Sequence, residues 1–339
     1  MRYGYWMPVF GGWLRNVEDE GMEASFDYVK RLAINAERIG FDLTLIAELY
    51  LNDIKGVDAP ALDAWSTAAA LAALTERQEL MVAVRPNFHQ PGPFAKTSAN
   101  IDRIANGRLS LNVVSSWWAR EAEMFGLDFD QHDDRYARTS EWIDVVEGLW
   151  SGEPFSYDGD IYSTNEARVV PSPVRKPPLY AGGESEAAKS LIAEKCDAYV
   201  MHGDDPDVVA SKIADMTERR VTAEREPLSF GMAGFVIVRD SEAEAQADLD
   251  RILEMKDVPP GYDNFDQWLA GTELERELKI REYAVSNRGL RPNLIGTPEQ
   301  VRQRIADFEG AGVDLLLLQF SPQYEEMERF AAQVMSRLE

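Results

Sequence analysis

The sequence predicts an α/β protein with a closed (β/α)8 barrel, the TIM-barrel fold, carrying insertions. Apolar, β-branched runs alternate with longer amphipathic stretches along the chain, and eight such runs can be counted. This alternation is typical of a parallel sheet with right-handed crossovers. The length of 339 residues suits a barrel of about 250 residues with insertions. No Gly/Ser or Pro linker divides the chain, so we expect a single domain over 1–339 in place of two domains of roughly 150 residues each.

The eight expected strands are short and apolar, and stretches with helical spacing separate or follow them. Strands are expected at 2–9, 42–47, 79–85, 108–114, 178–181, 197–201, 229–238 and 313–319. Helices are expected at 25–39, 61–75, 94–105, near 134–150, 185–195, 205–222, 242–255, 298–310 and 322–337. Local signals agree with these limits, since Pro8 and Pro86 end the first and third strands and Gly40 follows the first helix as a C-cap.

Two segments exceed what a minimal barrel needs, and we expect them to be insertions near 115–177 and 256–296. The first contains a polar loop and a β-like piece, in which Tyr157-Asp158-Gly159-Asp160 is a hairpin signal. The second contains Pro259-Pro260-Gly261 and a charged helical stretch. Long connections in a compact domain are usually functional walls or lids, so we expect the second segment to close over the site.

Composition excludes several classes of partner. A formal net charge of −24 argues against nucleic acid and anionic membranes, because their phosphate field repels an acidic protein. No run of about 18 apolar residues predicts a membrane span, and the N-terminal segment lacks a signal-peptide core, so we expect a cytoplasmic protein. The single cysteine, Cys196, cannot form an internal disulfide, and we expect it to be buried as a small hydrophobe. The three histidines lack metal-ligand spacing, so no metal site is expected.

The carboxyl ends of the strands are where a barrel of this kind places its active site. The residues there are mainly aromatic, hydroxyl-bearing or amide-bearing, with few charges. They are Trp6, Pro8, Glu48, Tyr50, residues 85–89, residues 112–118, residues 182–185, His202, Gly203 and residues 320–322. A carboxylate cluster of the glycosidase type and a two-metal ligand set are both missing, and the lining suits a flat heteroaromatic ring.

One strand-to-helix connection has the composition of an anion site. In the segment AGGESEAA, Gly183, Glu184 and Ser185 follow an expected strand and open a helix. Glycines allow close approach, and free N–H groups at a helix start attract an anion such as phosphate. An ordinary turn with Ser185 as a helix cap would give the same pattern.

The segment after the fourth strand, LNVVSSWW, offers polar groups to a bound ring. The Asn112 amide can both donate to and accept from the edge of a flavin or pyrimidine, or it could tie down a neighbouring loop. Ser115 and Ser116 could face the same pocket. Trp117 and Trp118 are adjacent, so we expect at most one of them to point inward.

Three further positions carry candidate chemistry. In HDDRY, Arg135 and Tyr136 could reach a phosphate from the first turn of a helix, although capping and a surface ion pair explain the pattern equally well. His132 could transfer a proton or serve only as a hydrogen-bonded structural histidine. His202 lies at the correct end of the barrel for a pocket, and Arg288 could fold over a bound anion or remain solvated.

The motifs NGRLSLNVVSSW, HDDRY, YAGGESEAA, NLIGTPEQV and AGVDLLLLQF, in this order, resemble the bacterial luciferase-like flavin monooxygenase family. Within it, the chain is most similar to the FMNH2-dependent enzymes for dimethyl sulfone and alkanesulfonates. The resemblance implies reduced FMN supplied by a separate NAD(P)H:flavin reductase, and a homodimer or homotetramer.

The resemblance also assigns roles to individual residues. It implies FMN contacts by Asn112 and Glu121 after the fourth strand, by Arg135 and Tyr136 on the next helix, by Gly183, Glu184 and Ser185 at the phosphate, and by Glu48 and Leu49 at the ring. His132 and Ser115 are the expected catalytic residues. Trp6, Trp117 and Phe235 would form the apolar wall of the substrate pocket, with His202 and Arg288 beside it.

The substrate that the resemblance implies is a small organosulfur compound. The alkanesulfonate enzymes carry Arg-x-His on the seventh strand, where this chain has Ala233 and Phe235. Without these charged contacts, a neutral substrate is preferred over an anion. The expected reaction uses O2 to oxygenate the substrate and cleave its C–S bond. The alternatives are an F420-dependent oxidoreductase of the same fold, a pyrimidine-type ring-opening monooxygenase, and a flavin carrier without catalytic activity.

Overall fold

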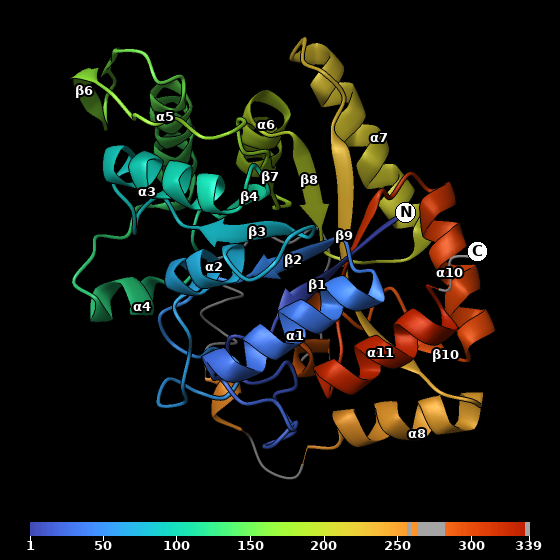
Figure 1. The fold of residues 1–339 in the computed structure, drawn as a ribbon. Helices are drawn as coiled ribbons and strands as arrows, with labels where there is room; N and C mark the ends of the chain where they lie inside the picture. The colour runs from blue at the N-terminus through green and yellow to red at the C-terminus, as the bar shows by residue number, and fades with distance from the viewer. Residues whose placement is uncertain (256–258, 264–281, 336–339) are drawn as a thin grey trace.

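The computed structural model describes residues 1–255, 259–263 and 282–335, and eight parallel strands close a barrel at its centre (Figure 1). In order around the barrel the strands are β1 (Arg2–Met7), β2 (Leu43–Ile46), β3 (Glu79–Val84), β4 (Leu109–Val113), β7 (Leu179–Ala181), β8 (Ala198–Met201), β9 (Ser229–Val238) and β11 (Leu315–Gln319). The pairing of β1 with β11 closes the ring, with Arg2 opposite Leu315. The predicted (β/α)8 barrel is confirmed, and all eight strands overlap the expected runs.

Helices surround the barrel, as the alternation predicted (Figure 1). They are α1 (Phe26–Ile39), α2 (Ala64–Ala72), α3 (Pro91–Ile104), α5 (His132–Trp150), α6 (Glu186–Lys195), α7 (Pro206–Thr222), α8 (Glu242–Leu253), α10 (Pro298–Gly310) and α11 (Gln323–Gln333). Side chains cap several of them, and Ser25 accepts a hydrogen bond from the backbone N–H of Tyr28 at the start of α1. The expected C-cap Gly40 has the left-handed φ of 99° that favours glycine.

Three short features lie outside the regular alternation. The β-like piece of the first insertion is a separate antiparallel hairpin of β5 (Phe155–Asp158) and β6 (Ser163–Ala167), beside α5. Helix α4 (Ala119–Met124) and strand β10 (Leu294–Gly296), which pairs with β9 outside the ring, were not predicted. With six and three residues, they are too short to show a hydrophobic period.

The inside of the barrel is filled at its amino-terminal end. Leu43, Leu45, Met81, Leu315 and Leu317 form an interior cluster with Tyr180 and Ala198. Below it, Arg2 Nη2 lies 2.7 Å from Glu79 Oε2, and Arg2 Nη1 donates to the Tyr180 hydroxyl at 3.4 Å. The barrel is therefore a packed core open only toward the carboxyl ends of its strands.

Cys196, the only cysteine, precedes β8 at the closed end of the barrel and is fully buried. Desolvation raises the pKa of its thiol to about 12. The expected burial as a small hydrophobe therefore agrees with its surroundings.

Most of the second insertion, the expected lid, lies outside the described residues. The described part holds three short 3-10 turns, η1 (Pro260–Tyr262), η2 (Glu282–Ala284) and η3 (Ser286–Arg288). Within the described ranges, no helix combines the length and the apolarity that crossing a membrane requires.

The packed interior makes a stability prediction. Replacing Leu317, which is fully buried inside the barrel, by alanine should lower the free energy of unfolding by about 2–5 kcal/mol, because a cavity remains. The matched control Leu74→Ala removes an exposed side chain and should change it by no more than about 0.5 kcal/mol. Chemical denaturation measures both, and equal effects would show that the interior is loosely packed.

Candidate active site

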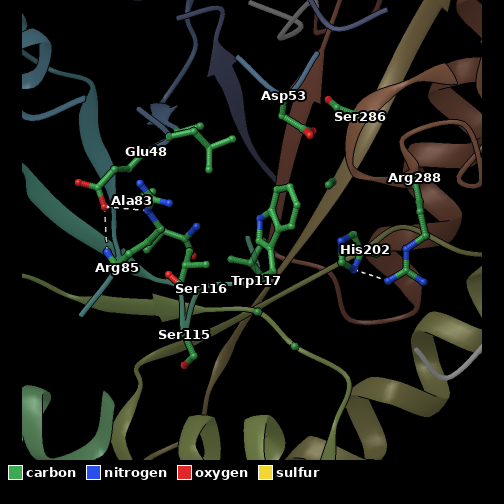
Figure 2. Close-up of a pocket in the computed structure, with 18 of the residues that line it drawn as sticks. Glu48, Asp53, Ala83, Arg85, Ser115, Ser116, Trp117, His202, Ser286 and Arg288 are labelled. Carbon is green, nitrogen blue, oxygen red and sulfur yellow. Dashed lines mark hydrogen bonds and ion pairs between the residues drawn. The ribbon is translucent and has the colours of Figure 1, made fainter. Parts of the chain in front are cut away.

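A cavity of about 300 Å³ opens at the carboxyl ends of the strands. Its floor consists of the last inward-facing side chains of the strands and of the residues directly after them. These are Trp6, Leu45, Ala47, Ala83, Asn112, Val114, Val200 and Ala233. The size and the apolar floor are those of a small-molecule site. Figure 2 shows Arg85 beside Glu48 on one wall, His202 and Arg288 on the other, and Trp117 between them.

The turn from β7 into α6 forms one end of the cavity. A Cβ atom at Gly182 would lie 2.5 Å from the carbonyl oxygen of Val200, so only glycine allows the turn to pass this close to β8. Ser185 is the N-cap of α6, and its hydroxyl accepts from the backbone N–H of Ala188 at 3.2 Å. The first turn of α6 therefore begins at the cavity, where its N–H groups can bind an anion.

The first turn of α5 reaches the same end of the cavity. The Tyr136 hydroxyl lies 3.6 Å from where a Cβ of Gly183 would stand, and Arg135 donates to the carbonyl oxygen of Ser116. His132, Arg135 and Tyr136 all line the cavity. The His132 Nδ1 atom lies 2.8 Å from Asp133 Oδ1, and the His132 and Tyr136 rings are 5.2 Å apart. A hydroxyl, a guanidinium and the start of α6 thus line the same cavity.

The segment after β4 lines the middle of the cavity. The Asn112 side chain makes no hydrogen bond with the described part of the protein, so its amide is available to a ligand. Ser115 Oγ lies 3.0 Å from Thr139 Oγ1. The Ser116 hydroxyl donates to Asn87 Oδ1 at 2.6 Å, which leaves Asn112 as the amide that faces the cavity here.

The two tryptophans that follow have different environments. Trp117 lines the cavity, whereas Trp118 is buried behind it. Their rings are stacked with centroids 5.4 Å apart. As expected, only one of the pair points inward, and the second supports it.

A charged cluster occupies the wall opposite Arg85. Glu184 accepts from Lys212 Nζ and from Arg288 Nη2, both at 2.9 Å, and Arg288 also contacts His202 Nδ1. Burial and the nearby Arg288 lower the pKa of His202 to about 3. Burial alone would raise the pKa of Glu184, but His202, Arg288 and Lys212 outweigh it and lower that pKa to about 2. Because His202 is neutral near pH 7, the two permanent cations carry this effect.

The ring-contact position after β2 is tied to β3 and α4. Glu48 Oε2 accepts from the backbone N–H of Arg85 at 2.9 Å, and Glu48 Oε1 lies 2.6 Å from His89 Nε2. Glu121, on α4, accepts from the backbone N–H of Tyr50 at 2.6 Å and pairs with the Arg85 guanidinium. Two buried carboxylates therefore hold the chain that borders the cavity at Leu49.

The structure corrects two expected positions. Glu121 is fully buried behind the wall and does not line the cavity, because its carboxylate is taken by Arg85 and by backbone N–H groups. Phe235 does not line it either. Its backbone N–H donates to the carbonyl oxygen of Gly289 at 2.7 Å, and Gly289, directly after η3, packs against its Cβ atom. The other expected site residues lie at the cavity, which leaves their roles as proposals.

Sequence reasoning placed Arg85 near the site but assigned it no role, and it missed the pair of Arg15 and Asp53. Arg15 Nη2 lies 2.7 Å from Asp53 Oδ2, and both line the cavity from loops after β1 and β2. The alternation of side chains along β3 could have identified Arg85, because its side chain is the next one after Met81 and Ala83 to face inward. No signal marks Arg15, whose position depends on loop conformation. The described ranges contain no group of three or more His, Cys, Asp or Glu residues that could hold a metal ion.

The fold and this site define a (β/α)8-barrel protein with a cavity at the carboxyl ends of its strands. A family model described as luciferase-like monooxygenase matches residues 1–315, and the chain belongs to this family. The FMNH(2)-dependent dimethylsulfone monooxygenase of Pseudomonas fluorescens (strain Pf0-1) is 31% identical over 344 residues, which cover 99% of this chain and 93% of that protein.

Solved structures agree on the fold. A long-chain alkane monooxygenase superposes with a TM-score of 0.83 at 18% identity, covering 98% of this chain and 90% of that one. A riboflavin lyase, solved with modified FMN and riboflavin, superposes with a TM-score of 0.82 at 20% identity, covering 99% of this chain and 90% of that one.

The Glu184 cluster makes a pH prediction. With a pKa of about 3, His202 should stay neutral while a free histidine titrates near pH 6.5, so its ring carbon resonances should not move between about pH 8 and pH 5. Histidine-selective NMR measures this directly, and His202→Gln identifies the signal. Titration of that signal near pH 6.5 would contradict the assignment.

Glu184 and His202 both make the folded protein less stable as the pH falls. Both folded-state pKa values lie below the unfolded values, so the unfolded chain binds protons more readily. The stabilising effect of neutral His202 is lost as the pH falls from about 6.5 toward 3, and that of charged Glu184 as it falls from about 4.5 toward 2.

Proposed function

We propose that this chain is a two-component monooxygenase that uses FMNH2 and O2 to oxygenate a small organosulfur compound and cleave its C–S bond. The observation that carries the proposal is the cavity, which combines an anion-binding end, an available Asn112 amide and an aromatic wall. The relative at 31% identity is named for FMNH2 and dimethylsulfone, which supports the same cofactor and substrate class.

The residues present fit FMN. Gly183, Ser185, Arg135 and Tyr136 would hold its phosphate, because they bring N–H, hydroxyl and guanidinium donors together at one end of the cavity. The Asn112 amide, which has no protein partner in the described ranges, would meet the polar edge of the ring. Glu48, Leu49 and Glu184 would border the cofactor, with Glu121 acting from behind through the backbone.

Reduced FMN supplies the electrons that activate O2, while the protein binds, orients and excludes water. Trp6 and Trp117 form an apolar wall that keeps the reacting atoms dry. His132 is proposed to hold or move a proton at Nε2, since Nδ1 is engaged by Asp133. The Ser115 hydroxyl donates to Thr139 Oγ1, whose own proton goes to the carbonyl oxygen of Arg135, so Ser115 Oγ would accept a hydrogen bond at the same side.

The proposal requires partners. FMNH2 would come from a separate NAD(P)H:flavin reductase, and we expect a cytoplasmic homodimer or homotetramer. Light scattering of the purified protein decides the oligomeric state.

The reaction is tested by oxygen consumption. With FMNH2 and dimethyl sulfone or methanesulfonate, the protein should consume O2 in proportion to substrate lost, measured by an oxygen electrode together with chromatography of the products. If a broad panel of sulfur compounds yields only hydrogen peroxide, the substrate class is wrong. If the protein binds F420 and not FMN in fluorescence titrations, the cofactor is wrong as well.

The phosphate site is tested by two substitutions. Ser185→Ala and Tyr136→Phe should each weaken FMN binding by about tenfold or more, because a hydrogen bond to a charged phosphate contributes about 1.5–3 kcal/mol. Ser25→Ala is the matched control, since it removes a helix cap of the same kind that does not line the cavity. It should lower stability as Ser185→Ala does and leave FMN affinity unchanged. Unchanged FMN affinity in the Ser185→Ala, Tyr136→Phe double variant would reject this phosphate site.

A further inference from the structure

Arg85 occupies a place in the cavity that none of the roles above uses. It follows β3, in which Met81 lies in the barrel interior and Ala83 lines the cavity, so Arg85 is the next inward-facing position. Its side chain is 3% exposed and lines the cavity. Its guanidinium carbon lies 3.7 Å from the centre of the Phe88 ring, which holds the group flat.

Two buried carboxylates compensate this single guanidinium. Arg85 Nη1 pairs with Glu121 Oε2, and Arg85 Nε lies 3.5 Å from Glu48 Oε2. Glu48 is 4% exposed and Glu121 is fully buried, so neither charge is screened well by water. One cation between two anions leaves this wall without net positive charge. An anionic ligand placed here would meet like charge in a desolvated site.

The guanidinium nevertheless keeps donors available. Arg85 Nη2 and Nε are buried and have no hydrogen-bond acceptor within the described residues, although Nε has its long ion pair with Glu48. These two atoms lie on one edge of the planar group and form a fork for oxygen acceptors. A buried donor without an acceptor costs about 1–3 kcal/mol, and an oxygen of a bound ligand would relieve it.

The other guanidinium groups of the walls differ in their partners. Arg15 pairs with Asp53 at 2.7 Å, whereas Arg288 shares Glu184 with Lys212, each at 2.9 Å. Arg135, at the Gly183 end, donates to the carbonyl oxygen of Ser116. Ala233 brings no charge to the floor. The walls at Arg15 and Arg85 therefore carry no net positive charge, and Arg85 still has donors without an acceptor within the described residues.

We propose that Arg85, held between Glu48 and Glu121, is a specificity-determining residue that binds an oxygen of a neutral substrate and disfavours an anionic one. The inference rests on the proposed function and narrows its substrate class to neutral sulfone-like acceptors. The carboxylates act through Arg85, so Glu48 and Glu121 are positioning residues in this role.

A matched pair of ligands tests the charge preference. Dimethyl sulfone and methanesulfonate are similar in size and differ in charge. Their affinities are measured through the fluorescence of the cavity tryptophans, with and without oxidised FMN. The wild-type protein should bind dimethyl sulfone at least about tenfold more tightly than methanesulfonate, a ratio that corresponds to about 1.4 kcal/mol.

Glu48→Gln removes one negative charge with little change in shape. The amide oxygen can keep the hydrogen bond from the backbone N–H of Arg85, and the amide nitrogen can donate to His89 Nε2, which lies 2.6 Å from Glu48 Oε1. The Trp65 indole N–H, which donates to Glu48 Oε1 at 3.1 Å, then loses its acceptor, so this variant should also be less stable. The affinity ratio should shift about tenfold toward methanesulfonate. The control Glu79→Gln makes the same change on β3 at the closed end of the barrel, beside Arg2, and should leave the ratio within about twofold of wild type.

Arg85→Lys keeps the charge and removes the fork. It should weaken dimethyl sulfone binding about tenfold while FMN affinity stays unchanged. This variant decides the question if Glu48→Gln fails to fold, which circular dichroism and thermal unfolding detect. If the Arg85 variant changes FMN affinity and not sulfone affinity, Arg85 serves the cofactor and the inference is wrong.

Two other outcomes also overturn the inference. One is a wild-type protein that prefers methanesulfonate or binds neither ligand, and the other is a folded Glu48→Gln protein whose ratio equals that of Glu79→Gln. The proposed function is judged separately by substrate-coupled oxygen consumption with FMNH2. Turnover of methanesulfonate in preference to dimethyl sulfone would support the proposed function and reject the preference for neutral substrates. An affinity ratio that depends on charge, without turnover of either compound, would support the role of Arg85 and reject the proposed function.

Discussion

Closure of the barrel is the constraint on which the rest of this structure depends. Because β1 pairs with β11, every second side chain of each strand points toward the axis of the barrel, where space is limited. At the lower end, leucines and the Arg2–Glu79 pair fill this axis completely. At the upper end the inward positions carry small or polar residues such as Ala83, Asn112 and Ala233, and a cavity results. The location of the site thus follows from the sizes of side chains at successive inward positions.

The polar groups around this cavity illustrate how a desolvated site holds charges. Each of the guanidinium groups Arg15, Arg85 and Arg288 has a carboxylate partner within 3.5 Å. A buried ion pair adds little net stability, because removing two charges from water costs about as much as their attraction returns. What such pairs provide here is orientation, since each joins segments from different parts of the chain. The same pairing leaves an apolar floor and a set of fixed donors, which suits a ring-shaped cofactor and a small substrate.

The sequence was informative wherever a regular repeat was long enough to be recognised. Within the described residues, the eight strands and nine helices of the barrel were predicted within a few residues, because apolar runs and caps such as Ser25 and Gly40 mark them locally. Helix α4 and strand β10 were not predicted, because they are too short to show a hydrophobic period. Glu121 was placed at the cofactor by resemblance, and its contact with backbone N–H groups of the neighbouring loop could not be read from spacing. Phe235 continues the inward-facing series of β9 after Gly231 and Ala233, but it packs against Gly289 and does not line the cavity.

The position of the single thiol affects how readily the protein is oxidised. Cys196 lies directly before β8, at the closed end of the barrel and away from the cavity. Oxidants attack thiolate and not thiol, and the pKa of about 12 keeps this sulfur protonated at physiological pH. Full burial and a protonated sulfur together make this single thiol a poor target for oxidants, although the fold gives it no disulfide partner.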